Sequence, residues 1–263
     1  MTVCIAAVCR TDAGPRVVLC TDQKAGSALG SAETALKQRT LGRNWISLTA
    51  GSESGIEALI SVYRAQLNKM GQPNRQNIDE VIRAPISQRK RQLAEEYVQA
   101  KLAVSYEYFL DQGREKLPPD MFNDIIRSIA SLNLDADFVI AGFISGFPDI
   151  YSVNSKGMVC ATDEFAVAGE GGYLASAALL RRGQNNILTL EQTLYNVYEA
   201  KKYAEAVGSV GKSTVLSVLA PERSDMMTIS VYTELAEMFS KYGPQSLPND
   251  IKLTAPYFLG AGA

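Results

Sequence analysis

The order of strand-like and helical segments constrains the fold of this 263-residue chain more than any single motif does. Apolar and β-branched runs between turn residues predict strands, which fall at 2–9, 16–22, 45–50, 138–141, 150–153, 158–160, 165–168, 214–219 and 227–231. Apolar residues at helical spacing predict helices, which begin near 52 and 118 and fall at 88–112, 173–182, 189–207 and 234–242. Because strands and helices come in blocks, the sequence favours an α+β fold with two sheets between helical layers over alternating βαβ units.

Local signals mark where some of these segments begin and end. Ser52 is a good N-cap, and the apolar residues that follow it on one helical face are Ile56, Leu59, Ile60, Tyr63 and Leu67. Thr189 opens a capping-box pattern that is completed by Gln192. Pro85 is expected to break or kink the helical region around it, because proline removes a helical hydrogen bond.

The composition excludes several classes of function. The net charge is −2 with acids and bases mixed along the chain, so no basic surface points to nucleic acid. The chain has no histidine, which excludes a Ser-His-Asp triad, a Cys-His pair and a histidine-ligated metal. No apolar run approaches the roughly 20 residues that span a membrane. We therefore expect a cytoplasmic protein with no metal, no cofactor and no membrane or nucleic-acid partner.

The cysteines indicate a reducing compartment. They are Cys4, Cys9, Cys20 and Cys160, and no two of them form a Cys-x-x-Cys pair. We expect free, buried thiols. A catalytic cysteine is not expected, since no histidine is present to generate a thiolate.

Thr2 stands directly behind the initiator Met1. Methionine is readily removed before a small residue, and the chain would then begin with a threonine that carries both a free α-amine and a hydroxyl. An α-amine has an ordinary pKa of roughly 7.7–8.0. It can therefore act as general base for the neighbouring hydroxyl near neutral pH, which makes Thr2 a candidate nucleophile for acyl transfer.

Several segments resemble a known family in both order and spacing. They are Thr2 after Met1, the hairpin ending at 18–22, Lys37 before the third strand, the strand-turn-helix at 48–52, the block 141–153 and the helix entry at 169–171. With them the chain resembles a β-type proteasome subunit, one of the N-terminal-nucleophile hydrolases, over residues 2–70 and 136–242. The ancestral-β-subunit (Anbu) and HslV-like groups are the most similar.

The resemblance implies catalytic roles for four residues. Lys37 would lie beside the Thr2 hydroxyl, lower its pKa and shuttle its proton. Asp22 would pair with Lys37 and fix its orientation. The positive charge of Lys37 would also help to keep the α-amine unprotonated. The backbone N–H of Gly51 would stabilise the oxyanion, and glycine would let the substrate approach the backbone closely.

Other family positions match less well. Glu170 stands where the family has a serine that steadies the threonine amine, and a carboxylate there would raise the pKa of the amine. Glu205 and Ser209 are the nearest match to a further acid and serine, one residue out of register. The alternatives are a helix-N-terminal acid for Glu170 and a plain loop hydroxyl for Ser209. Arg39 and Thr49 fall at substrate-pocket positions of the family and suggest a polar pocket.

Residues 206–214 approximate a phosphate-binding P-loop, with alanine in place of the first glycine. A genuine P-loop follows a strand and opens a helix, so that helix amides point at the phosphate. This segment instead follows a predicted helix and enters a predicted strand. Its glycines are better explained as a helix end and a turn.

The resemblance thus implies a four-layer αββα sandwich, a single domain over 1–263 with a helical insertion at about 72–135 and an irregular tail at about 243–263. The expected activity is that of a threonine peptidase, which cleaves peptides or unfolded proteins through an acyl-enzyme on Thr2. We expect a homo-oligomer, either a ring or a spiral, and the resemblance leaves open whether a separate ATPase unfoldase is a partner. The alternatives are an amidohydrolase acting on a small amide and a catalytically silent assembly subunit.

Overall fold

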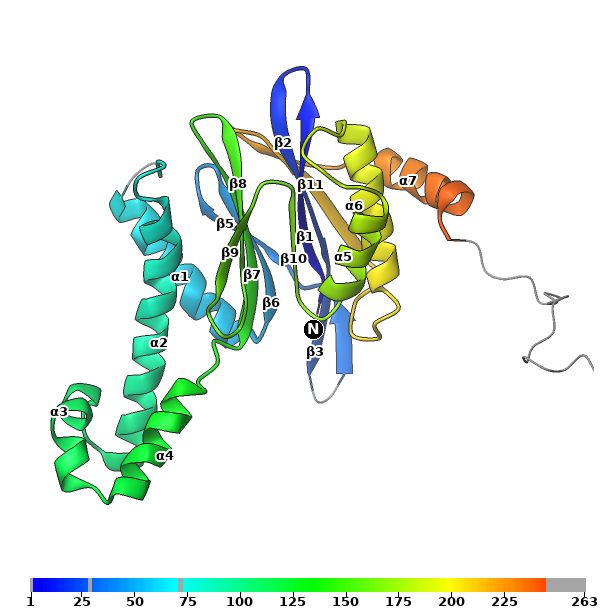
Figure 1. Cartoon of the computed structure of the whole chain (residues 1–263). Helices are drawn as coiled ribbons and strands as arrows, with labels where there is room; N and C mark the ends of the chain where they lie inside the picture. The colour runs from blue at the N-terminus through cyan, green and yellow to red at the C-terminus, as the bar shows by residue number, and fades with distance from the viewer. Residues whose placement is uncertain (1, 28–29, 71–72, 245–263) are drawn as a thin grey trace, which may run out of the picture.

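The computed structural model describes residues 2–27, 30–70 and 73–244. They form a mixed α+β fold with antiparallel sheets (Figure 1). Met1, whose removal is predicted, lies outside these ranges, and so does most of the predicted tail at 243–263. Within the described residues, no helix combines the length and the apolar character that crossing a bilayer requires.

The first sheet contains the beginning of the chain. Its strand order is β10-β1-β2-β11-β12. The strands are β1 (Cys4–Thr11), β2 (Gly14–Asp22), β10 (Phe165–Ala168), β11 (Thr214–Leu219) and β12 (Ser224–Met226). The near-continuous apolar run in β1 is explained by burial of both faces, since alternate residues pack into two different cores. One face contributes Ile5 and Ala7, and the other contributes Cys4, Ala6 and Val8.

The second sheet has the order β5-β6-β7-β8-β9. Its strands are β5 (Gln38–Gly42), β6 (Trp45–Gly51), β7 (Ala136–Ile144), β8 (Phe147–Val153) and β9 (Val159–Thr162). A separate hairpin pairs β3 (Lys24–Ser27) with β4 (Gly30–Glu33) and lies beside the start of β1 (Figure 1). Residues of β1, β2, β6 and β7 share one apolar cluster, which packs the two sheets against each other.

Helices bury the remaining apolar faces. They are α1 (Glu53–Met70), α2 (Ile78–Leu102), α3 (Tyr106–Lys116), α4 (Pro119–Ala130), α5 (Gly172–Arg181), α6 (Leu190–Ala204) and α7 (Ile229–Tyr242). Residues of α5, α6 and α7 pack on the first sheet, and residues of α1 and α2 pack on the second. The far end of α2 continues into α3 and α4, which extend away from the sheets around their own small core of Val98, Phe109 and Ile125 (Figure 1).

Two local predictions of helix structure are confirmed. The face of α1 is buried at Ile56, Leu59, Ile60, Tyr63 and Leu67, and the Gly55 N–H donates to Ser52 Oγ at 3.2 Å. The capping box before α6 is present in both directions, with Gln192 N donating to Thr189 Oγ1 at 3.3 Å and Thr189 N donating to Gln192 Oε1 at 3.1 Å.

The helical region after residue 77 differs from the prediction. The expected helix at 88–112 is two helices, because Ala103 adopts a left-handed conformation (φ 55°) that ends α2, and Ser105 then caps α3. Pro85 lies inside α2 and does not break it. A proline in a helix interior costs about 3 kcal/mol. Burial of its neighbours Val81, Ile82 and Ile86 against the second-sheet core offsets that cost.

Three further expectations were wrong or incomplete. The strand expected at 227–231 is not formed; α7 begins at Ile229, and Val231 packs one helical turn before Leu235 on the first-sheet core. Such a short apolar run does not by itself distinguish a strand from a helix. The β3–β4 hairpin and β5 were not predicted, since their residues are largely polar or small. Cys160 is exposed because it lies on β9, at the edge of its sheet.

Candidate active site

Three chemically active side chains meet at one end of the first sheet. Thr2 precedes β1, Asp22 ends β2 and Lys37 precedes β5. All three are buried, with 1%, 0% and 9% of their surfaces exposed, respectively. Lys37 Nζ lies 2.9 and 3.0 Å from the two Asp22 carboxylate oxygens. Thr2 Oγ1 accepts a hydrogen bond from Lys37 Nζ and donates one to Asp22 Oδ1, so the hydroxyl is held by both charged groups.

The Asp22 carboxylate is surrounded by donors. Its Oδ1 also accepts from Val3 N at 3.1 Å. Its Oδ2 accepts from Lys24 N at 3.0 Å and Gly211 N at 2.8 Å. A buried charge is tolerated when it is both paired and hydrogen-bonded. Asp22 meets both conditions, so its carboxylate is held in place beside both Thr2 and Lys37.

The backbone of Thr2 is held by the loop that follows β10. The Gly171 N–H donates to Thr2 O at 3.1 Å. Gly169 has φ +81°, and a Cβ there would collide with the same Thr2 carbonyl oxygen. Glycine is therefore required at 169 both by conformation and by the close approach of the first described residue of the chain.

A cavity of about 540 Å³ opens beside this group. Its lining includes Thr2 and Lys37, and also the pocket candidates Arg39 and Thr49 together with Gly51. Thr2 therefore lies at the wall of a cavity whose volume is within the range of small-molecule binding sites.

Gly51 lines this cavity, and strand geometry places its amide on the β5 side of β6. The Thr49 N–H donates to Lys37 O at 2.9 Å, on the β5 side of β6. Amides two residues apart in a strand point to the same edge of that strand. The Gly51 N–H therefore also faces the β5 side of β6. Because β5 begins at Gln38, which pairs with Leu48, Gly51 lies past the end of that strand pairing. Gly51 has φ +128°, and a Cβ there would overlap Asp135 O.

The pocket candidates have structural partners that the sequence did not indicate. Arg39 forms ion pairs with Glu53 at 2.7 Å and Glu57 at 3.3 Å, both from the first turns of α1. The Thr49 hydroxyl donates to Lys37 O at 3.2 Å. Thr49 therefore holds the backbone of Lys37 and also lines the cavity.

Glu170, Ser209 and Glu205, which match the family positions less well, have different surroundings in the structure. Ser209 Oγ donates to Glu170 Oε2 at 2.6 Å, and Glu170 stands between the two glycines that contact Thr2. Glu205 has a different set of partners, the Nζ atoms of Lys201 at 2.5 Å and Lys202 at 2.8 Å. Glu170 and Ser209 thus form a pair next to the Thr2 loop, whereas Glu205 ends α6 in an ion pair with lysines of its own helix.

The segment at 206–214 follows α6 and leads into β11, the reverse of the order that a P-loop requires. Its Gly211 amide is committed to Asp22 and its Gly208 carbonyl accepts from Lys24 Nζ at 2.7 Å. Across the described ranges, no three His, Cys, Asp or Glu side chains are grouped so that they could hold a metal ion.

The buried thiols near the site are poor nucleophiles. Burial raises the pKa of the Cys20 thiol to about 12. It also raises the pKa of Cys4, which follows Thr2 by two residues. A thiol with a raised pKa stays protonated near neutral pH and does not attack.

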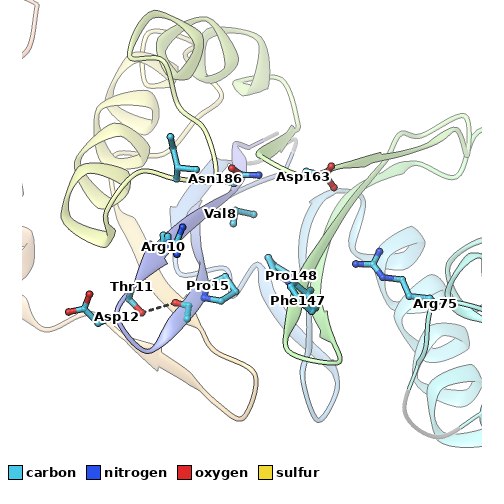
Figure 2. A pocket seen from close by; sticks show the side chains of 12 residues that line it. Val8, Arg10, Thr11, Asp12, Pro15, Arg75, Phe147, Pro148, Asp163 and Asn186 are labelled. Carbon is cyan, nitrogen blue, oxygen red and sulfur yellow. Dashed lines mark hydrogen bonds between the residues drawn. The ribbon is translucent and has the colours of Figure 1, made fainter.

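A second cavity of about 500 Å³ lies at the opposite end of β1, around the β1–β2 turn (Figure 2). There Thr11 Oγ1 donates to Gly14 O at 2.7 Å, as the dashed line in Figure 2 marks. The charged groups on its wall include both arginines and aspartates, such as Arg10 and Asp163. Its threonine hydroxyl is thus engaged in a turn, whereas that of Thr2 is held between an ammonium and a carboxylate.

No protein-family model matches this chain, and no curated protein matches its sequence.

Proposed function

We propose that the chain is a threonine peptidase of the N-terminal-nucleophile type, built on a four-layer αββα sandwich. The observation that carries the proposal is the buried Thr2 hydroxyl held between Lys37 Nζ and Asp22 at the wall of a cavity. The proposed substrates are peptides or unfolded polypeptides, and several copies of the chain would assemble around them.

The proposed chemistry uses side-chain and backbone groups of the chain together with one water molecule. After removal of Met1, Thr2 Oγ attacks the scissile carbonyl while its proton passes to the α-amine, and Lys37 stabilises the developing alkoxide. The Gly51 N–H stabilises the oxyanion. The carbon–nitrogen bond then breaks, and the leaving amine takes the proton from the α-ammonium. Water hydrolyses the resulting ester and restores the threonine.

A substrate panel tests the reaction class. Fluorogenic peptides, an unfolded polypeptide and small acyl amides would be incubated separately with the purified protein, and product amines would be measured. We expect cleavage of the peptides. Turnover of small amides alone would identify an amidohydrolase, and turnover of none would favour a silent assembly subunit.

The pH dependence follows from the proposed base. The α-amine must be neutral to accept the proton, and its ordinary pKa is roughly 7.7–8.0. We expect the rate of Thr2 modification by a β-lactone to fall about tenfold for each unit of pH below the pKa of that amine. A rate that stays constant from neutral to mildly acidic pH would contradict the amine as base.

Gly169→Ala tests the placement of Thr2. The new methyl group would meet the Thr2 carbonyl, so we expect the rate of β-lactone labelling to fall at least tenfold. Gly183→Ala is the matched control, because Gly183 also has positive φ (+64°) but a Cβ there has nothing within 4 Å. Both variants lose about 1 kcal/mol from the left-handed backbone. Equal labelling rates in the two variants would contradict the proposed role of the 169 loop.

A further inference from the structure

The loop at 208–213 is held in place from several sides. Lys24 Nζ donates to Gly208 O at 2.7 Å, and the fully buried Lys201 donates through Nζ to Lys212 O at 2.6 Å. The carboxylate of Glu33, the last residue of β4, accepts from Lys212 N at 2.8 Å and Ser213 N at 2.5 Å. The β3–β4 hairpin therefore contacts both ends of the loop: β3 bonds to Gly208, and β4 bonds to Lys212 and Ser213.

One amide of the loop reaches the candidate active site. The Gly211 N–H donates to Asp22 Oδ2 at 2.8 Å, and the next two amides along the chain are the ones that bind Glu33. A Cβ at Gly211 would lie 2.7 Å from Lys24 Cβ and 3.0 Å from Asp22 Oδ2, so the loop backbone packs directly on the site. Movement of Lys212 and Ser213 would therefore move the Gly211 donor.

We propose that Glu33 is a positioning residue for the peptidase reaction, in that its carboxylate fixes the 211–213 backbone so that the Gly211 N–H holds Asp22 against Thr2 and Lys37. This inference rests on the proposed function. Glu33 does not line the 540 Å³ cavity, and its side chain touches neither Thr2 nor Lys37 in any contact that the structure records. Its effect on Thr2 reaches the nucleophile through Gly211 and Asp22.

The charge of Glu33 suits this role. The hydroxyl of Ser213 and the two amides together lower the pKa of Glu33 to about 2, so the carboxylate remains ionised over the range in which a neutral α-amine could act. An ionised oxygen accepts stronger hydrogen bonds from backbone amides than a neutral one. The substitution Glu33→Gln keeps the shape but removes the charge and turns one acceptor into a donor.

Labelling kinetics test the proposal. For Glu33→Gln we expect the maximal rate of Thr2 modification by a β-lactone to fall about tenfold. A factor of that size corresponds to the free energy of partly losing one hydrogen bond to a charged group. The probe concentration that gives half the maximal rate should change less than about twofold, because Glu33 is not part of the cavity wall. The matched control is Glu107→Gln on α3, an exposed glutamate that pairs with Arg91 at 2.5 Å; it should label like the wild type.

Hydrogen exchange of the peptide that covers 207–214 supplies an independent readout. We expect faster exchange in Glu33→Gln than in the wild type, with thermal unfolding changed little. If the wild type is labelled and Glu33→Gln is labelled at the same rate, the role of Glu33 is overturned and the peptidase proposal is unaffected. A wild-type protein that the β-lactone does not label would overturn the peptidase, and with it the role given to Glu33. If the maximal rate and the probe affinity of Glu33→Gln fell by the same factor, the positioning role of Glu33 would also be overturned, because that result indicates a general disturbance of the pocket.

Discussion

Replacing Thr2 by alanine is expected to abolish peptide cleavage, with a loss of at least about a thousandfold in kcat/KM. Alanine removes the hydroxyl oxygen that both Lys37 Nζ and Asp22 contact just before β1. Alanine is also small, so removal of Met1 should continue and the new chain should still carry a free α-amine. The loss would therefore be due to the hydroxyl itself.

Two variants make this result specific. Thr2→Ser keeps a primary hydroxyl in the same place and should retain measurable cleavage. Thr11→Ala removes the threonine hydroxyl at the opposite end of β1, where it donates to Gly14 O within a turn, and should leave cleavage unchanged. Residual activity of Thr2→Ala above about a tenth of the wild type would show that another group is the nucleophile.

Asp22→Asn is expected to lower both stability and reactivity by a large amount. Every group that hydrogen-bonds to the carboxylate is a donor, including the amides of Lys24 and Gly211, so the new NH2 group would face donors. Lys37 would also lose its counter-charge while remaining buried. Breaking a buried ion pair from one side costs about 3–5 kcal/mol, and we expect that decrease in the free energy of unfolding measured in urea.

A double variant separates stability from chemistry. Asp22→Asn combined with Lys37→Met removes both charges, and it should recover part of the lost stability while Thr2 remains unreactive toward a β-lactone. Asp225→Asn is the control, because Asp225 forms an exposed ion pair with Arg223, and such pairs contribute about 0–1 kcal/mol. If Asp22→Asn unfolded no more easily than Asp225→Asn, the buried pair would not have the importance assigned to it.

Much of the fold could be predicted because its signals are local. The buried face of α1 and the capping box at Thr189 depend on spacing within one or two helical turns, and both are present. The continuation of α2 through Pro85 depends on packing against distant residues, and the left-handed conformation that ends α2 at Ala103 has no signal in the sequence. The β3–β4 hairpin has four exposed residues in β4 and therefore lacks the apolar alternation that marks a strand.

Some residues of the candidate site could likewise be proposed from the sequence, and others could not. Thr2 was proposed from its own chemistry, and Asp22 and Lys37 were proposed from the resemblance to the β-type proteasome subunits; the structure brings all three into contact. The contribution of Gly211 comes from a backbone amide, which every residue except proline has, so its sequence position gives no signal. Glu33 reaches the loop from 180 residues away in the chain, a pairing that one sequence does not reveal.

Mass spectrometry of the intact protein, before and after treatment with a β-lactone, tests the central claim most directly. We predict a chain that lacks Met1 and that gains the mass of one probe molecule, which peptide mapping then places on Thr2. A chain that retains Met1, or a probe that leaves Thr2 unmodified while the protein is folded, would contradict it.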